Sequence, residues 1–230
     1  MTYAPTMNNS GNMLDHIARL FRQDNVSGSD FSRITLADRM AFLNLGREYI
    51  ARRTHCLHGS WNFPTVIGTA SYSWTTNLPD LIRVERVLYG TTILERVQSE
   101  EDFYYWRTLT TNGTPSRFYD DFGNNLWVFV PPSAVGTIYV YGSKFPTPFT
   151  GITDAEVLPI RLRLAAVYAA AAAIYESLDV PDPQRAKNYQ DRAELVVSQE
   201  EQMMGDDRFF DSDQYEIPMG YSDAYTEPES

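Results

Sequence analysis

The residues best suited to bind a metal ion stand together in the segment His55-Cys56-Leu57-His58. Histidine nitrogen and cysteine thiolate are common zinc ligands, so this segment could supply part of a tetrahedral site. A second ligand pair is missing, because Cys56 is the sole cysteine of the chain and His16 is its only other histidine. Zinc sites encoded in sequence usually show two paired spacings. We therefore expect no metal and interpret the segment as an ordinary helix end.

Two adjacent acids, Asp120 and Asp121, could suggest the paired carboxylates of glycoside hydrolysis. Neighbouring residues on a regular strand point to opposite faces, so these side chains cannot share one site. We expect a solvated strand or turn there. The sequence also has no phosphate-binding glycine loop, no Gly-x-Ser-x-Gly elbow and no His-Glu-x-x-His helix. These observations predict no catalytic residues, no cofactor and no enzymatic activity.

Aromatic side chains could stack on bases or sugars, and arginines could contact phosphate. For the aromatic residues we favour core and subunit packing, which is their commonest use. For the arginines we favour a solvated face or a subunit contact. The aromatic set is Trp61, Trp74, Tyr104, Tyr105, Trp106 and Trp127, and the basic run is Arg47, Arg52 and Arg53.

The last residues, 205–230, form a segment that we call the C-terminal arm. It holds eight acidic residues and one arginine, so it carries −7 of the total net charge of −11. A solvated tail would carry few aromatics, so spaced apolar residues in an acidic segment favour an arm that orders on a partner. A disordered, solubilising tail stays open as the alternative. The apolar residues of the arm are Phe209, Phe210, Tyr215, Ile217, Met219, Tyr221 and Tyr225.

The totals set further limits on a chain of 230 residues, which is long enough for one sizeable domain or two small ones. One cysteine cannot form an intrachain disulfide, which points to synthesis in a reducing cytoplasm. The N-terminus lacks a basic segment followed by an apolar one, so we expect no secretory signal. The negative charge argues against tight general binding of nucleic acid.

A helix over residues 160–178 should organise the fold. Its buried stripe is predicted from three-and-four spacing, and its flanks are mostly alanine, which lets other helices approach closely. The longest uninterrupted apolar run is 165–175, much shorter than the roughly 20 residues of a membrane span. The predicted stripe is Ile160, Leu164, Val167, Ala171, Ile174 and Leu178, and the predicted positions of close helix packing are Gly46, Ala169, Ala170 and Ala173.

Four helix starts show a capping residue followed three positions later by an acid. They are Asn12, Thr35, Ser99 and Thr153. Because Pro159 cannot lie deep inside a helix, we expect the Thr153 cap to serve a separate turn and the long helix to start near Pro159. Helices are predicted over 13–23, 36–57 and 100–109, and a last helix opens at Asp182-Pro183 and ends at Gly205.

Strand-like runs separated by Gly, Pro and Asn fill the middle of the chain. They cover 61–66, 71–74, 81–89, 92–97, 117–122, 125–130 and 137–145, and the last three should form consecutive antiparallel strands. The predicted fold class is α+β. A helical bundle is built from both ends of the chain (1–59 and 149–204), an antiparallel sandwich or barrel-like module is inserted at 60–148, and the arm follows at 205–230.

The central module resembles the head-to-tail adaptor (connector) proteins of short-tailed bacteriophages. The resemblance covers about residues 36–204, and it depends on the order and spacing of several weak motifs. They are Trp61-x-Phe63-Pro64, Gly68-x-x-x-Tyr72, Leu78-Pro79-Asp80-x-x-Arg83-x-x-x-Val87, Gly113-x-Pro115, Leu126-x-Val128-x-Val130-Pro131, Ile138-x-Val140-Tyr141 and Pro146-x-Pro148.

The resemblance implies a virion protein made in the host cytoplasm, without catalytic residues, cofactor or membrane contact. Such proteins form a ring of about twelve copies. The ring lies below the portal protein and receives the tail nozzle or tail tube protein, with tail fibres as further candidate partners. DNA would meet the protein only in transit through the channel. The arm departs from the family pattern, so the resemblance implies nothing about its role.

Two other functions stay open. A carbohydrate-binding or receptor-binding tail module would use the β-module as its reader, with exposed tryptophans such as Trp74 and Trp106. A tail-associated hydrolase would need Asp120 and Asp121 for activity.

Overall fold

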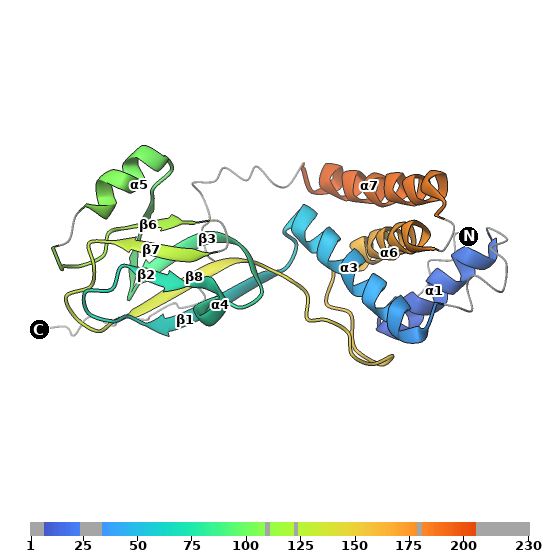
Figure 1. The fold of residues 1–230 in the computed structure, drawn as a ribbon, viewed down its shortest axis with the longest axis horizontal. Coiled ribbons are helices and arrows are strands. Elements are labelled where there is room, and N and C mark those ends of the chain that lie inside the picture. Colours follow the sequence, from blue (N-terminus) through green and yellow to red (C-terminus); the bar gives the residue numbers. More distant parts are fainter. Residues whose placement is uncertain (1–6, 24–33, 109–110, 122–123, 179–180, 206–230) are drawn as a thin grey trace, which may run out of the picture.

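The computed structural model describes residues 7–23, 34–108, 111–121, 124–178 and 181–205. These residues form a mixed α+β fold with six α-helices and two mainly antiparallel sheets, which confirms the predicted fold class at this level. Figure 1 shows the sheets and helix α5 at one end of the molecule and helices α1, α3, α6 and α7 at the other. The C-terminal arm after Gly205 lies outside the described residues.

One hydrophobic core joins four helices: α1 (Ser10–Gln23), α3 (Leu36–Thr54), α6 (Arg163–Ser177) and α7 (Pro183–Gly205). The alanine-rich helix α6 contacts each of the other three. Stacked rings also link the helices, since the Tyr175 ring lies 4.5 Å from Phe21 and 5.6 Å from Tyr189 between centroids.

Helices α3 and α6 cross closely at Gly46. A Cβ atom added to Gly46 would overlap the Ala166 carbonyl oxygen and would lie 2.8 Å from the Ala170 nitrogen. Ala170 is completely buried, whereas Ala169 and Ala173 are half-buried. Small side chains therefore let the two backbones approach each other at Gly46 and Ala170.

The predicted stripe of α6 is right at its centre and wrong at its start. Val167, Ala171 and Ile174 are completely buried, but Ile160 is 72 % exposed. Ile160 belongs to a short 3-10 helix, η1 (Ile160–Leu162), whose tighter turn brings Leu162 into the core instead.

Three of the predicted helix starts are confirmed. Thr35 and Asp38 form a reciprocal capping box at α3. The Ser99 hydroxyl accepts a hydrogen bond from the Asp102 backbone at the start of α5 (Glu100–Arg107). The Asp182 carboxylate accepts from a backbone N–H of the first turn of α7 at 3.0 Å.

Of the other two candidates, the Asn12 cap is wrong. Helix α1 begins at Ser10, two residues before Asn12, and the Asn9 side chain accepts from the Asn12 backbone. Thr153 lies in a separate turn, in which the Asp154 carboxylate accepts from two backbone N–H groups, and the helical segment starts directly after Pro159, as predicted. The acid at position 156, which suggested the cap, has a different partner described below.

Two four-stranded sheets form the other end of the molecule. The first sheet has the order β1-β8-β3-β4 and the second has the order β2-β7-β6-β5. The strands are β1 (His58–Pro64), β2 (Ser71–Ser73), β3 (Leu81–Tyr89), β4 (Thr92–Ile93), β5 (Glu95–Arg96), β6 (Arg117–Asp120), β7 (Asn125–Phe129) and β8 (Thr137–Lys144). All pairs are antiparallel except β5 with β6.

The prediction of three consecutive antiparallel strands is wrong, because β6 and β7 pair with each other but β8 joins the other sheet. Val130 follows β7 with a positive φ of 62°, and Pro131 and Pro132 then provide no N–H groups. The chain therefore leaves the second sheet at this point.

The predicted strand over 92–97 is also divided between the sheets. The Leu94 nitrogen donates to Val87 in the first sheet, and the Glu95 nitrogen donates to Ser116 beside the second sheet. Trp74, predicted as the end of a strand, instead begins the short helix α4 (Trp74–Asn77).

A second hydrophobic core includes residues of both sheets, such as Val84 and Val140 of the first and Leu126 and Val128 of the second. The helical core reaches Leu57 and Phe149, and the sheet core begins at Phe63. The predicted domain boundaries at 59/60 and 148/149 stay predictions.

Candidate functional site

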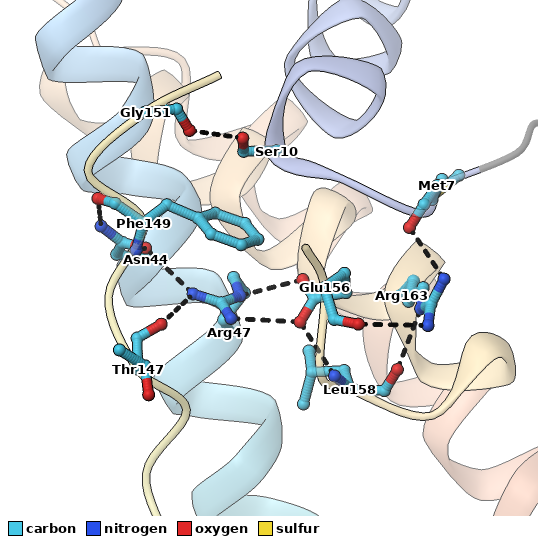
Figure 2. A network of polar contacts seen from close by, with 10 residues as sticks. All are labelled: Met7, Ser10, Asn44, Arg47, Thr147, Phe149, Gly151, Glu156, Leu158 and Arg163. Atoms are coloured by element: carbon cyan, nitrogen blue, oxygen red, sulfur yellow. Dashed lines mark hydrogen bonds and ion pairs between the residues drawn. The ribbon is translucent and has the colours of Figure 1, made fainter. Parts of the chain in front are cut away.

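Arg47 is only 1 % exposed, so its predicted place on a solvated basic face is wrong. Its guanidinium forms two hydrogen bonds with the Glu156 carboxylate, Nε to Oε2 at 2.9 Å and Nη2 to Oε1 at 3.1 Å. Nη1 donates to the Asn44 side chain and to the Thr147 carbonyl, and the group lies 3.6 Å from the Phe149 ring centroid. Figure 2 shows Arg47 enclosed by these partners.

This network fixes the segment that returns from the sheets to helix α6. The Asn44 amide donates to the Phe149 carbonyl and its oxygen accepts from the Phe149 nitrogen. Glu156 also accepts from the Leu158 nitrogen at 2.9 Å, and Arg163 donates to the Leu158 carbonyl (Figure 2). A buried charge pair needs such additional partners to offset desolvation. Arg47 therefore acts as a clamp between α3 and residues 147–158.

The other two arginines of the basic run lie at the surface. Arg53 pairs with Glu201 at 2.9 Å and lies 3.6 Å from Glu194, both on α7. Arg52 lies with its guanidinium 5.2 Å from the Phe145 ring centroid. Their positions agree with the predicted solvated face.

Arg52 also lines an open cleft where the helical end meets the sheets, and we call it the junction cleft. Its volume is about 770 Å³. Its walls come from the end of α3, from α4, from β3, β5 and β6, and from the residue after β8. The lining residues are Arg52, His55, Trp74, Thr75, Leu78, Pro79, Asp80, Leu81, Ile82, Arg83, Arg96, Asp120 and Phe145.

The candidate zinc segment does not gather ligands. His55 ends α3 in a left-handed conformation (φ 51°) and its Nδ1 is 2.9 Å from the Ser143 hydroxyl. His58 instead lies 3.6 Å from the Glu85 carboxylate. Burial, with a smaller effect of the Arg83 guanidinium, lowers the pKa of His55 below its usual 6.5. In the described part of the chain no three His, Cys, Asp or Glu residues are grouped as a metal site.

The two adjacent aspartates differ in burial. Asp120 is 4 % exposed and lies 3.7 Å from Arg96, so the expectation of a solvated carboxylate is wrong for this residue. Asp121 follows the end of β6 and is half-buried. Asp120, at the end of strand β6, lines the junction cleft, and Asp121 does not. Because side chains alternate along a strand, only one of two adjacent residues is expected to face the cleft.

The aromatic residues divide into packed and exposed members. Trp74 is buried at 7 % exposure, and the Trp61 indole donates to the Pro79 carbonyl. Trp106 is half-buried, and the Arg117 guanidinium lies 4.5 Å from its ring centroid. Only Tyr104 and Tyr105 of this set stand well exposed, at 55 % and 63 %. The set is therefore mainly a packing element.

The six predicted partner-binding residues of the C-terminal arm, Phe209, Phe210, Tyr215, Ile217, Tyr221 and Tyr225, lie outside the described residues. Sequence reasoning noticed Arg47 and Glu156 separately but missed their pairing, because 109 residues separate them. One feature of the sequence did indicate another role for Glu156. Pro159 follows too closely for a helix to begin at Thr153, so the Glu156 carboxylate was not needed for a helix cap there.

Comparison with known protein families identifies the family of the chain. The model of the SU10 adaptor protein family matches residues 1–211. The chain belongs to this family and is therefore a phage adaptor protein, a structural component of the virion, as the resemblance implied. No curated protein matches the chain. Among the described helices, none has both the length and the apolar character needed to cross a membrane.

Proposed function

We propose that the protein forms a ring between the portal protein and the tail nozzle, seals the joint and leaves a channel for DNA. The observation that carries the proposal is the family match over residues 1–211, nearly the whole chain. A ring of about twelve copies would follow the cyclic symmetry usual for such assemblies. We also propose that the protein has no enzymatic activity, since Asp120 and Asp121 are adjacent in the chain at the end of β6, and neighbouring side chains of a strand point to opposite faces and cannot share one site.

The two-part structure supports this role, because an adaptor must contact two different neighbours. The helical end and the sheet end have separate hydrophobic cores, so each could present its own surface. The Arg47 clamp attaches the segment that returns from the sheets to helix α3. A channel wall of net negative charge would not retain passing DNA, and residues 1–204, outside the arm, carry −4 of the total −11.

The C-terminal arm is proposed as the segment that joins the ring to its neighbour, which is the portal, an adjacent subunit, a nozzle or tube protein, or a tail fibre. Its apolar residues stand in a segment too short and too acidic for a core of its own. Burying one aromatic side chain contributes about 1.5–3 kcal/mol, so several copies around a ring would hold the joint.

Truncation after Gly205 tests the arm. We expect the truncated chain to keep its far-UV circular dichroism but to join its partner in the virion unstably. A matched variant that replaces residues 206–230 by an equally acidic segment without aromatics separates charge from apolar contact. If the truncated chain forms infectious particles with normal efficiency, the arm is only a solubilising extension.

A carbohydrate-binding or receptor-binding module is the second candidate, and the exposure of Tyr104 and Tyr105 favours it. Neighbouring exposed tyrosines on α5 could stack on sugar rings. A glycan array with the full chain and with Tyr104→Ala/Tyr105→Ala decides the matter. Binding lost in the variant would support this candidate. Trp74 is unsuitable as a sugar platform because it is buried.

A further inference from the structure

The junction cleft has more free cationic than anionic character. Arg52 and Arg83 have no carboxylate within ion-pair distance in the described part of the chain, and both are exposed. Arg96 lies 3.7 Å from Asp120, and Asp80 is the other acid of the lining. Two arginines are thus available to carboxylates from outside the cleft.

Most of the remaining wall of the junction cleft is apolar. Leu78 and Leu81 are buried, and Phe145 is half-buried beneath the Arg52 guanidinium. The Trp74 indole Nε1 is buried, and none of the described residues accepts its hydrogen bond. A ligand with carboxylates, further acceptors and an aromatic ring would therefore match the cleft.

The C-terminal arm begins beside this cleft. Arg53 of α3 pairs with Glu201 of α7 at 2.9 Å, which places the last turn of α7 next to the last turn of α3. Figure 1 shows these two helix ends close together. Arg52 and His55 of the same end of α3 line the cleft. Helix α7 ends at Gly205, one turn beyond Glu201.

The first residues after this point have the chemistry that the cleft requires. Residues 206–211 read Asp-Asp-Arg-Phe-Phe-Asp, three acids with two adjacent phenylalanines. Six extended residues span about 20 Å, enough to pass from the end of α7 across a cleft of this size. The segment is attached to the body, so its effective concentration at the cleft is high and even a weak contact forms in a large share of the molecules.

We propose that residues 206–211 bind the junction cleft of their own chain. The aspartate carboxylates contact Arg52 and Arg83, and the phenylalanine rings lie against the apolar wall. The contact sets the direction in which the arm leaves the body, and residues 212–230 stay available to a partner. The inference goes beyond the proposed function and does not depend on it, because the cleft and the segment belong to one chain.

Chymotrypsin cleavage of the full chain, followed by mass spectrometry, tests the proposal. Cleavage after Phe209 and Phe210 should be slow in the natural chain. In the variant Arg52→Glu/Arg83→Glu it should become about tenfold faster, because the open population rises. The matched control Arg19→Glu/Arg22→Glu makes the same charge change on the exposed side of α1 and should leave the rate unchanged.

A charge exchange makes the test specific. Asp206→Lys/Asp207→Lys alone should also speed cleavage, and combined with Arg52→Glu/Arg83→Glu it should restore protection. This arm variant changes no residue of the folded body, so it tests the contact even if the cleft variant fails to fold. Unchanged cleavage in the arm variant would overturn the proposal.

Three other results would also overturn it. If protection in the natural chain increases with protein concentration, the segment binds another copy. If the cleft variant keeps full protection while folded, the segment is covered elsewhere. If the cleft variant loses binding of a short DNA duplex but shows unchanged cleavage, the arginines serve nucleic acid instead.

Discussion

Arg47 joins segments that are 109 residues apart in the sequence, and it does so where almost no solvent reaches. The charge is tolerated there because Glu156, Asn44 and Thr147 together accept hydrogen bonds from all three nitrogens of the guanidinium. Removing one member of such a pair leaves the other buried and uncompensated. At the scale of single residues, this clamp is where we expect the fold to be most sensitive.

The first prediction concerns Glu156→Ala. Its free energy of unfolding in urea should fall by about 3–5 kcal/mol, because the Arg47 charge stays buried without its partner. The matched control is Glu201→Ala, which removes an exposed partner of Arg53 and should cost at most about 1 kcal/mol. Equal losses in the two variants would contradict the assignment of the clamp.

The second prediction concerns the pH dependence at His55. Burial lowers its pKa in the folded state below 6.5, so the unfolded chain binds more protons in the acidic window. Stability should therefore fall as pH decreases below 6.5 towards the folded-state pKa. Asparagine tolerates the left-handed conformation, so His55→Asn should keep the fold. In this variant the difference in unfolding free energy between neutral and mildly acidic pH should be smaller than in the natural chain.

A second variant, His58→Asn, removes an exposed imidazole whose charge acts on the half-buried His55, so it shows how much of the effect depends on that neighbour. If His55→Asn keeps the full pH dependence of the natural chain, protonation of His55 is not coupled to folding.

At the scale of elements, the sequence predicts the features that depend on contacts between residues close together in the chain. The Thr35 and Ser99 caps each involve residues three positions apart, so both could be identified from the sequence. The sheet membership of β8 could not, because its partners β1 and β3 lie far away in the chain. Alternation fixes which face of a strand is buried but not the strand that pairs with it.

The candidate site follows the same division. The absence of a second zinc ligand pair was visible in composition alone. The burial of Arg47 was not, because arginines are usually solvated and the partner comes from a segment far away in the chain. The junction cleft arises where six separate parts of the chain meet, and no linear motif encodes it.

The third prediction concerns the crossing of α3 and α6. Gly46→Ala should lower the free energy of unfolding by about 1–3 kcal/mol, although alanine favours helix, because its methyl group would overlap the backbone of α6. Gly151→Ala is the control, since a Cβ there would find only ordinary contacts, the nearest at 3.5 Å. A stabilised Gly46→Ala chain would show that the crossing can open without cost.

The fourth prediction compares two neighbours on α6. Ala170→Leu should destabilise the chain more than Ala169→Leu, by about 1–3 kcal/mol, because Ala170 is completely buried against α3 and Ala169 is half-buried. Thermal melting of both variants measures the difference. Identical melting temperatures would mean that the alanine-rich surface has no close-packed side.

At the scale of the whole molecule, the helical core and the main core of the sheets are linked by the connection from α3 to β1 and by the clamped return segment after β8. The C-terminal arm carries most of the net charge, so the body itself is close to neutral. Such a body can pack against copies of itself with little charge repulsion, while the arm stays attractive to cationic surfaces. This distribution supports the ring and arm of the proposed adaptor.

The most direct test of the adaptor account is electron microscopy of the purified full chain, alone and mixed with its phage's portal protein. The account predicts a closed ring with the portal's symmetry, stacked on one face of the portal and open along its axis. Particles in which the chain stays separate from the portal, or binds it without forming a ring, would contradict the account.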